Sequence, residues 1–467
     1  MTDAHTRHQL SILVVLWLGG FFLVNSFFGI TIALPEIQRD FGTQFSDLQW
    51  LSIMGWVTMA ALSLPFSRLA DRLGRRRFYT GGLVLYAVGS GLTGVANNFE
   101  VMLIFRAVMS IGLAIAMPLG PAIAAAAFPE RRGWALGIVA SSMAMGRAMG
   151  PILGGAVIEP WGWRAIFLSN LAFGAVAAIA AFLLIRNIVE ERRSEPFDLK
   201  GTIALLIAFP CLLIPITRGP QDGWSAPHQL VLFTIAAVGA AAFIMAEAKA
   251  RSPLIPLGYF KNLSFSAAVG ALSISSLATF PVIVFVPLYL KASFNLSPLE
   301  IGLWMTPLAV STAVFSTVGG RWSDQMDPRS ISFWGLVLGV LGLALYAMLE
   351  ADSAYVMIAG ALILLGISGG LFTPANQKAA FVGAGGAQLG MISAVLASLN
   401  MAAGAIGTSI AVAVHESRMG EGVSFAEGQQ VTFMIFVPIM VIAASIALLG
   451  RPPKTIPASE APAKAPA

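Results

Sequence analysis

Long apolar stretches, separated by short polar segments, run along almost the whole chain. Each stretch has about 20 residues, the length that a helix needs to cross the ~30 Å hydrocarbon core of a bilayer. Only helices or closed barrels satisfy their backbone groups there, so the pattern predicts an all-α, polytopic membrane protein. We count fourteen expected spans: 10–34, 49–67, 79–97, 101–126, 134–157, 165–185, 199–216, 229–246, 264–289, 299–318, 331–349, 354–374, 387–413 and 431–450.

Lys and Arg residues are more numerous in every second segment that joins these spans. If the N-terminus is cytoplasmic, 21 of the 28 Lys and Arg residues fall in cytoplasmic segments and five in external loops. Basic residues resist translocation, so this bias predicts both termini in the cytoplasm. The first span lacks a cleavage site and reads as a retained helix. We expect a multi-pass protein of a bacterial inner (plasma) membrane.

The composition of the chain and the positions of its charges limit the kinds of function that it can have. The chain is 57% hydrophobic and 11% charged, with a mean hydropathy of +0.80. Its basic surplus belongs to loops that face anionic lipid, and does not indicate nucleic-acid binding. All 23 acidic residues and all four histidines fall outside the middle of the spans, which leaves Arg106 and Arg147 as the charges inside them. No cluster at catalytic spacing predicts an enzyme, a metal site or a cofactor.

Two cytoplasmic loops repeat each other. Residues 67–77 and 320–329 align with Asp71 over Asp324, and the same offset carries Arg147 onto Asn400, which we therefore also expect to bind substrate. Such repeats are typical of transporters whose substrate lies between two halves. We therefore expect two six-helix bundles with an inserted helix pair between them. The expected divisions are 1–186, 187–262 for the inserted pair, 263–450, and a disordered cytoplasmic tail at 451–467.

The loop after the second span reads Leu69-Ala70-Asp71-Arg72-Leu73-Gly74-Arg75-Arg76. It resembles a signature of the major facilitator superfamily, and the chain as a whole resembles its fourteen-helix drug/proton antiporter family, although Ser67 replaces the first glycine of the pattern. The resemblance implies a gate on the cytoplasmic side, in which a carboxylate and arginines clamp neighbouring helix ends. The alternative is that the arginines only set topology. The expected gating residues are Asp71, Arg72, Gly74, Arg75 and Asp324.

The fifth span carries the glycine spacing of the family's antiporter motif. Gly146, Gly150 and Gly154 recur every four residues, and Gly155 and Pro151 accompany them. Small residues let helices pack closely, and proline removes a backbone hydrogen bond. We expect this helix to be a hinge where the two bundles meet.

Other family positions are altered. Arg106 in the fourth span matches an arginine to which the family assigns proton coupling and substrate contact, but Met109 replaces a glutamine. In the first span, Asn25 lies where the family has an aspartate, which puts cationic drugs and ordinary proton antiport in doubt. Asn25 either binds substrate or bridges two helices. Arg106 either faces substrate or reaches toward the interface as a structural residue.

Arg147 lies near the expected centre of the bilayer, with no acid at its depth. An intramembrane arginine needs a polar cavity, an anion or backbone carbonyls. We expect it to anchor substrate in a central cavity shared by spans 1, 4, 5, 10 and 13; carbonyls at the Pro151 kink are the alternative. Met109 and Met143 are expected either to line this cavity with adaptable apolar surface or to fill the core.

These features predict a secondary active transporter that exports amphiphilic small molecules, drugs or organic anions, by alternating access with a proton link. Two unpaired positive charges favour an anionic or neutral substrate. The alternative is a specific organic-anion permease or exchanger without proton coupling. Protons would be carried by an interfacial acid such as Glu36, Asp47 or Glu300, by the substrate, or not at all. Oligomeric state stays open.

Overall fold

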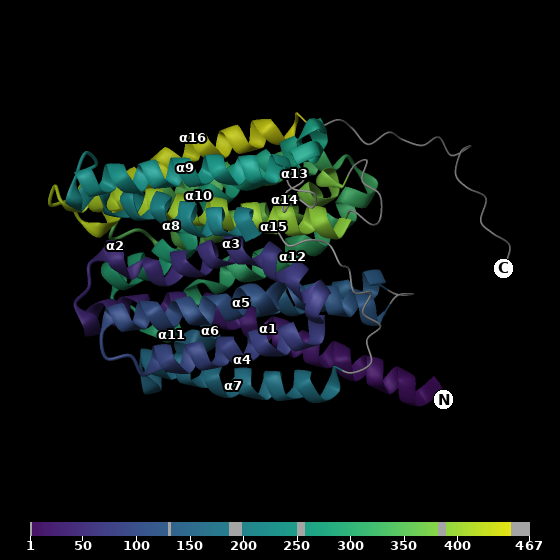
Figure 1. The fold of residues 1–467 in the computed structure, drawn as a ribbon. Coiled ribbons are helices and arrows are strands. Elements are labelled where there is room, and N and C mark those ends of the chain that lie inside the picture. Colours follow the sequence, from purple (N-terminus) through teal and green to yellow (C-terminus); the bar gives the residue numbers. More distant parts are fainter. Residues whose placement is uncertain (1, 129–131, 186–198, 250–256, 382–388, 450–467) are drawn as a thin grey trace.

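The computed structural model describes residues 2–128, 132–185, 199–249, 257–381 and 389–449. Most of these residues lie in long helices that run roughly along one axis (Figure 1). The expected tail at 451–467 lies outside them. Within the described ranges the long helices are α1 (Thr2–Phe41), α3 (Trp50–Leu73), α4 (Arg75–Gly94), α5 (Phe99–Ala127), α6 (Arg132–Trp161), α7 (Trp163–Leu184), α8 (Leu199–Asp222), α9 (Pro227–Lys249), α10 (Leu263–Phe294), α12 (Thr306–Gln325), α13 (Pro328–Ala347), α14 (Tyr355–Ala380), α15 (Leu389–Met419) and α16 (Phe425–Ala447).

Each expected span overlaps one of these helices, and most helices extend beyond the span by several residues. In the part of the chain that the structure describes, 11 helical segments are long and apolar enough to cross a membrane. Helices α3, α4 and α6 are not among these segments: α3 and α6 contain residues whose side chains the structure does not describe, and α4 begins with three arginines. The number of fourteen spans therefore stays a prediction.

The expected span 299–318 is interrupted. Helix α11 (Pro298–Trp304) ends before Met305, and α12 begins at Thr306. Pro307 explains the break, because it has no N–H to donate and its ring clashes with the preceding turn of a continuous helix. The Ser297 side chain accepts from the Glu300 backbone, and the Glu300 carboxylate accepts from the Ser297 backbone, so α11 begins with a capping box.

The helices form two packed groups. Helices α1 and α3–α7 pack mainly on one another, as do α10 and α12–α16. Helix α8 packs on both groups, against α3 and α15, and α9 packs on α8. The division into two six-helix bundles with an inserted pair stays a prediction.

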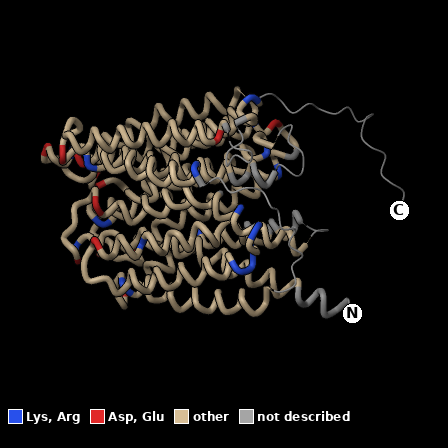
Figure 2. Tube along the Cα trace, in the orientation of Figure 1, with Lys and Arg blue, Asp and Glu red and all other residues tan. Residues whose placement is uncertain are grey.

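Charged residues concentrate at the two ends of the helices, and the middle is mostly uncharged (Figure 2). The short helix α2 (Phe45–Leu48) and α11 lie at one end, which we call the α2 end. Helix α1 begins, and α16 finishes, at the opposite end (Figure 1). The α2 end is the external one in the predicted topology.

The glycines of α6 allow a close approach to α1. A Cβ atom on Gly146 would lie 2.5 Å from the Phe21 carbonyl oxygen, and one on Gly150 would lie 2.8 Å from that of Asn25. Such distances leave no room for a side chain. The glycine ridge therefore packs within the first helix group, against α1.

Candidate functional site

A cavity of about 240 Å³ lies between the two helix groups. Its lining comes from α1, α3, α5 and α6 on one side and from α10, α12–α16 and Met305 on the other. All five spans that we expected to share a central cavity contribute, as do α3, α10, α13, α14 and α16, which we did not expect. Phe27, Phe28 and Trp56 make the first wall aromatic, whereas α10 adds a run of hydroxyl groups to the second.

Arg147 is the one charged side chain among the described residues that line this cavity. It lies deep in the molecule and is nonetheless exposed, because it borders the cavity. Its guanidinium carbon lies 5.4 Å from the centre of the Phe28 ring, a cation–π contact. Within the described ranges no hydrogen bond or ion pair satisfies it. The guanidinium is therefore available to a ligand.

Arg106 has a different environment. It is only 1% exposed, its Nε donates to the Leu51 carbonyl oxygen at 2.9 Å, and an Nη contacts the Met109 sulfur at 3.1 Å. It lies two turns before Leu113, a cavity residue, on the side toward the α2 end. Arg106 and Met109 are thus absent from the cavity lining in this conformation.

Of the remaining predicted binding residues, one lines the cavity and the others do not. Asn400 lines the cavity from α15. Asn25 is not in the lining, and its side-chain oxygen is buried without a hydrogen-bonding partner in the described structure. Met143 packs against the hydrophobic core. The structure thus brings Arg147 and Asn400 to one cavity and places the other four predicted residues elsewhere.

Helices α6 and α11 close the α2 end between the two groups. A Cβ on Gly155 would lie 2.4 Å from the Pro298 carbonyl oxygen, and one on Gly302 would lie 2.4 Å from that of Pro151. The Glu159 carboxylate accepts from the hydroxyl of Ser297 at 3.0 Å and from the backbone N–H of Leu299 at 3.1 Å. Gly155 therefore packs on α11, unlike the ridge glycines, which pack on α1.

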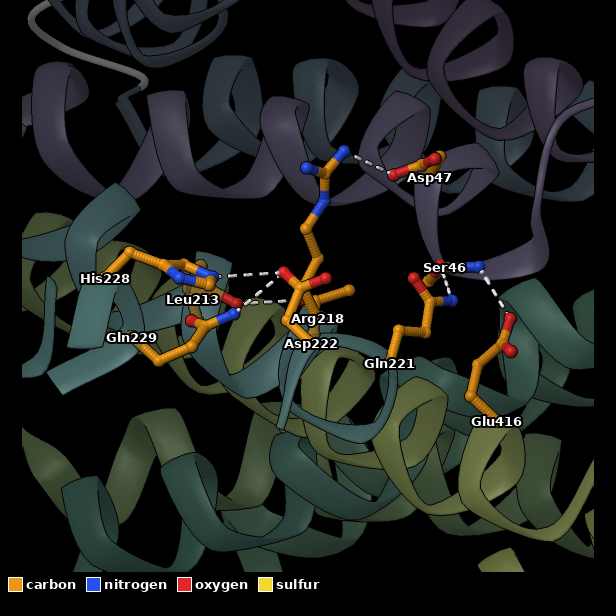
Figure 3. A network of polar contacts seen from close by, with 10 residues as sticks. Ser46, Asp47, Leu213, Arg218, Gln221, Asp222, His228, Gln229 and Glu416 are labelled. Carbon is orange, nitrogen blue, oxygen red and sulfur yellow. Dashed lines mark hydrogen bonds and ion pairs between the residues drawn. The ribbon is translucent and has the colours of Figure 1, made fainter. Parts of the chain in front are cut away.

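Helix α2 contributes a second set of closing contacts at this end (Figure 3). The Ser46 backbone N–H donates to the Glu416 carboxylate of α15 at 2.9 Å, and the Gln221 amide of α8 donates to the Ser46 hydroxyl at 2.6 Å. Arg218 of α8 pairs with Asp47 at 2.8 Å. The neighbouring Phe45 ring packs between α10 and α15 residues, 5.0 Å from the His415 ring.

We call these interactions the outer gate, defined by Ser46, Asp47, Glu159, Ser297 and Glu416. Sequence reasoning considered Asp47 only as a proton carrier and missed the others. The Ser-x-x-Glu pattern at 297–300 marks a helix start, but no sequence signal pairs it with Glu159.

The predicted gating residues lie at the opposite end. The side chains of Asp71 and Asp324 are outside what the structure describes. Gly74 joins α3 to α4 with a φ of 111°, a conformation that suits glycine. Arg72 is exposed, and Arg75 donates to the Ala122 carbonyl oxygen of α5 at 3.2 Å.

Comparison with known proteins agrees with this architecture. The family model described as Major Facilitator Superfamily matches residues 16–284 and 271–467. The multidrug resistance protein Stp of Mycobacterium tuberculosis is 30% identical over 410 residues, which cover 87% of this chain and 75% of that protein. The riboflavin transporter RibZ of Clostridioides difficile is 27% identical, with 85% and 86% covered.

Solved structures show the same fold. A bacterial homologue of the human lysosomal transporter Spinster, in an inward-facing and unoccupied conformation, superimposes with a TM-score of 0.69 at 17% identity, covering 95% of this chain and 96% of that one. The human organic anion transporter MFSD10 gives 0.62 at 17% identity, covering 94% and 99%. With its helical membrane architecture, its cavity between two helix groups and a family match along nearly its whole length, this chain belongs to the major facilitator superfamily.

Proposed function

We propose that this protein is a secondary active transporter of the inner membrane that exports amphiphilic small molecules, organic anions in particular, through the cavity around Arg147. Several relatives carry names of export or drug resistance, among them the tetracenomycin C resistance and export protein of Streptomyces glaucescens at 26% identity. These names support a small-molecule substrate. The charge of the substrate is inferred from the residues that line the cavity.

The main support for the proposal is that the Arg147 guanidinium lines the cavity without a hydrogen-bonding partner in the described structure. A guanidinium at this depth is costly unless a partner satisfies it, and no acid lines the cavity in the described structure. An organic anion supplies that partner through charge-assisted hydrogen bonds. The aromatic wall of Phe27, Phe28 and Trp56 then packs on the apolar body of the same molecule. A cationic drug meets repulsion from Arg147 instead.

We also propose that transport occurs by alternating access, which the closing contacts at the α2 end support. The outer gate closes the α2 end, and we propose that substrate exchange in this conformation takes place from the opposite side. The proposed cycle opens the outer gate by movement of α6 around Pro151, Gly154 and Gly155, while Asp71, Arg72, Gly74, Arg75 and Asp324 close the cytoplasmic side.

Proton linkage is a separate part of the proposal. The cavity lining includes no carboxylate or histidine among the described residues, so protons would be bound at interfacial acids such as Glu36, Asp47 or Glu300, or carried by the substrate. The second candidate function, an organic-anion permease or exchanger without proton coupling, uses the same Arg147 site.

Purified protein in liposomes tests the proposal. We would measure fluxes of an anionic, a neutral and a cationic aromatic amphiphile, with pH gradients of both signs. Arg147→Met should lower transport of the anion by tenfold or more and leave the neutral compound within about twofold, because a charge-assisted hydrogen bond contributes ~1.5–3 kcal/mol. Met401→Leu, an apolar change in the same cavity, is the matched control.

The proposal is wrong if Arg147→Met leaves anion transport unchanged while cationic compounds still move. Flux that follows the pH gradient supports proton-linked export, whereas anion exchange independent of the gradient supports the second candidate.

A further inference from the structure

Helices α10, α12 and α15 contribute hydroxyl and amide groups to one wall of the cavity, and the hydrogen bonds of these groups show which of them can still accept from a ligand. Building on the proposed function, we infer that this wall is a hydrogen-bond-accepting subsite, and that the transported amphiphile carries a hydroxyl or amino group that donates to it. The groups concerned are Ser276, Thr279, Thr312 and Asn400, all of which line the cavity.

Three hydroxyl protons are already used within the helices. Ser276 Oγ lies 2.6 Å from the Leu272 carbonyl oxygen, Thr279 donates to the Ser275 carbonyl at 2.9 Å, and Thr312 donates to the Leu308 carbonyl at 2.8 Å. A hydroxyl has a single proton and two lone pairs. Once that proton is bound to the preceding turn, only the lone pairs remain for a ligand.

Asn400 extends this wall. The Ser276 oxygen contacts both the Leu272 carbonyl and the Asn400 side-chain oxygen, which would require two protons from one hydroxyl. Turning the Asn400 amide by half a rotation resolves the conflict, because oxygen and nitrogen of an amide are assigned from the hydrogen-bond network. Asn400 Nδ2 then donates to Ser276, and Asn400 Oδ1 becomes another acceptor.

The two walls of the cavity therefore differ in hydrogen-bonding character. Arg147, on α6, offers only donors, whereas the part of the second wall that α10, α12 and α15 form offers mainly acceptors. A ligand that spans the cavity can pair with both walls when it carries an anionic group that binds Arg147 and a hydrogen-bond donor that binds the opposite wall. A ligand with an ether in place of the hydroxyl leaves buried acceptors unpaired. The structure thus favours hydroxylated or amino-substituted aromatic acids over their purely apolar counterparts.

Three related probes separate these contributions: naphthoate, its hydroxy derivative and the methoxy derivative, which is larger but has no donor. Their binding to the purified protein would be measured by calorimetry, and their transport in liposomes. We expect the wild type to bind hydroxynaphthoate about fivefold to tenfold more tightly than methoxynaphthoate. Thr279→Val and Asn400→Leu, alone and together, should reduce that preference to within about twofold.

Thr312→Val provides a second route if Asn400→Leu fails to fold, and Met401→Leu is the control for altered packing. The inference is overturned if the wild type shows no preference for the hydroxy compound, or if the preference survives in the folded variants. Arg147→Met distinguishes this outcome from failure of the proposed function: the anion site is wrong if that variant binds naphthoate as tightly as the wild type, whatever the hydroxyl preference. If the wild type binds none of the three acids, both proposals fail.

Discussion

Arg106 and Arg147 are both arginines within apolar helices, yet they have opposite surroundings. Arg106 is enclosed and bonds to the Leu51 carbonyl, so its charge is satisfied by the protein. Arg147 faces a cavity and makes a cation–π contact with the Phe28 ring, and within the described part of the chain it has no hydrogen bond or ion pair. We therefore assign a structural role to Arg106 in this conformation and a ligand-binding role to Arg147.

This difference predicts different effects on stability. Arg106→Met should lower the free energy of unfolding by about 1–3 kcal/mol, because the Leu51 carbonyl loses a partner in a buried site. Arg147→Met should leave the free energy of unfolding unchanged or raise it, because it removes a guanidinium that has no hydrogen-bonding partner at this depth. Thermal denaturation in detergent, followed by size-exclusion chromatography, would compare the two variants. Equal losses would contradict the assignment.

At the scale of elements, short contacts between helices decide which surfaces meet. Helices α6 and α11 touch through Gly155 and Gly302, where a side chain has no space. Helix α13 depends on a different local interaction: Asp327 caps its N-terminus by accepting from the Arg329 backbone at 3.1 Å, and also binds the Arg329 side chain. The first contact joins α6 to α11, and the second stabilises one helix.

Gly302→Ala should shift the protein toward a state that is open at the α2 end, because its Cβ would lie 2.4 Å from the Pro151 carbonyl oxygen. The measurement is labelling of Met305→Cys, in a Cys211→Ser background, by an impermeant maleimide applied from the α2 end. We expect labelling several times faster than in the parent. Gly320→Ala, where nothing lies within 4 Å, is the control. Unchanged labelling and transport would show that the contact does not limit opening.

The cap of α13 should give a pH-dependent contribution to stability. Burial raises the pKa of Asp327, but hydrogen bonds and charge from Arg329 outweigh it and hold the pKa below the usual value of 3.8. The stabilisation is therefore complete above that usual value and is lost as pH falls through the lower folded-state pKa. Asp327→Ala should cost about 1 kcal/mol at neutral pH and progressively less in acid.

The matched control is Asn98→Ala at the cap of α5, where the Asn98 side chain accepts from Val101 N at 2.8 Å and does not titrate. Its cost should be independent of pH. Parallel pH profiles for the two variants would exclude the Arg329–Asp327 interaction as the cause.

For the whole molecule, closure at the α2 end depends on elements that are far apart in sequence. Glu416 near the end of α15 holds α2, and α8, from the inserted pair, reaches the same residues through Arg218 and Gln221 (Figure 3). The Arg218–Asp47 pair is solvent-exposed and contributes little by itself. The less exposed Glu416 contact, which joins the two helix groups, matters more for closure.

Glu416→Gln keeps the shape of the side chain and removes its charge, which weakens the bond from the Ser46 N–H. We expect faster labelling of Met305→Cys from the α2 end, by about twofold to tenfold. Glu421→Gln, which removes an exposed pair with Arg418 in the adjoining loop, should leave labelling unchanged. If both variants behave alike, Glu416 has no particular part in the outer gate.

The amino-acid sequence determined the features that depend on local pattern. Apolar stretches predicted the helices, loop charges predicted a shared side for both termini, and the charge count showed Arg147 without an acid at its depth. These properties need no knowledge of neighbouring helices, because helix formation and membrane insertion depend on the segment itself. Pro307 was visible as well, but the break between α11 and α12 was missed because the apolar pattern continues across it.

Only the tertiary structure decided which polar groups meet. Arg106 and Arg147 look alike in sequence, and packing alone gives one the Leu51 carbonyl and the other a cavity. In the sequence, the hydroxyl residues of α10 are ordinary polar residues. Only the packing of the facing helices places them in the cavity lining. Glu159 and Ser297 are 138 residues apart and meet through docking of α6 against α11. Such contacts depend on where distant helices pack, which no local sequence pattern specifies.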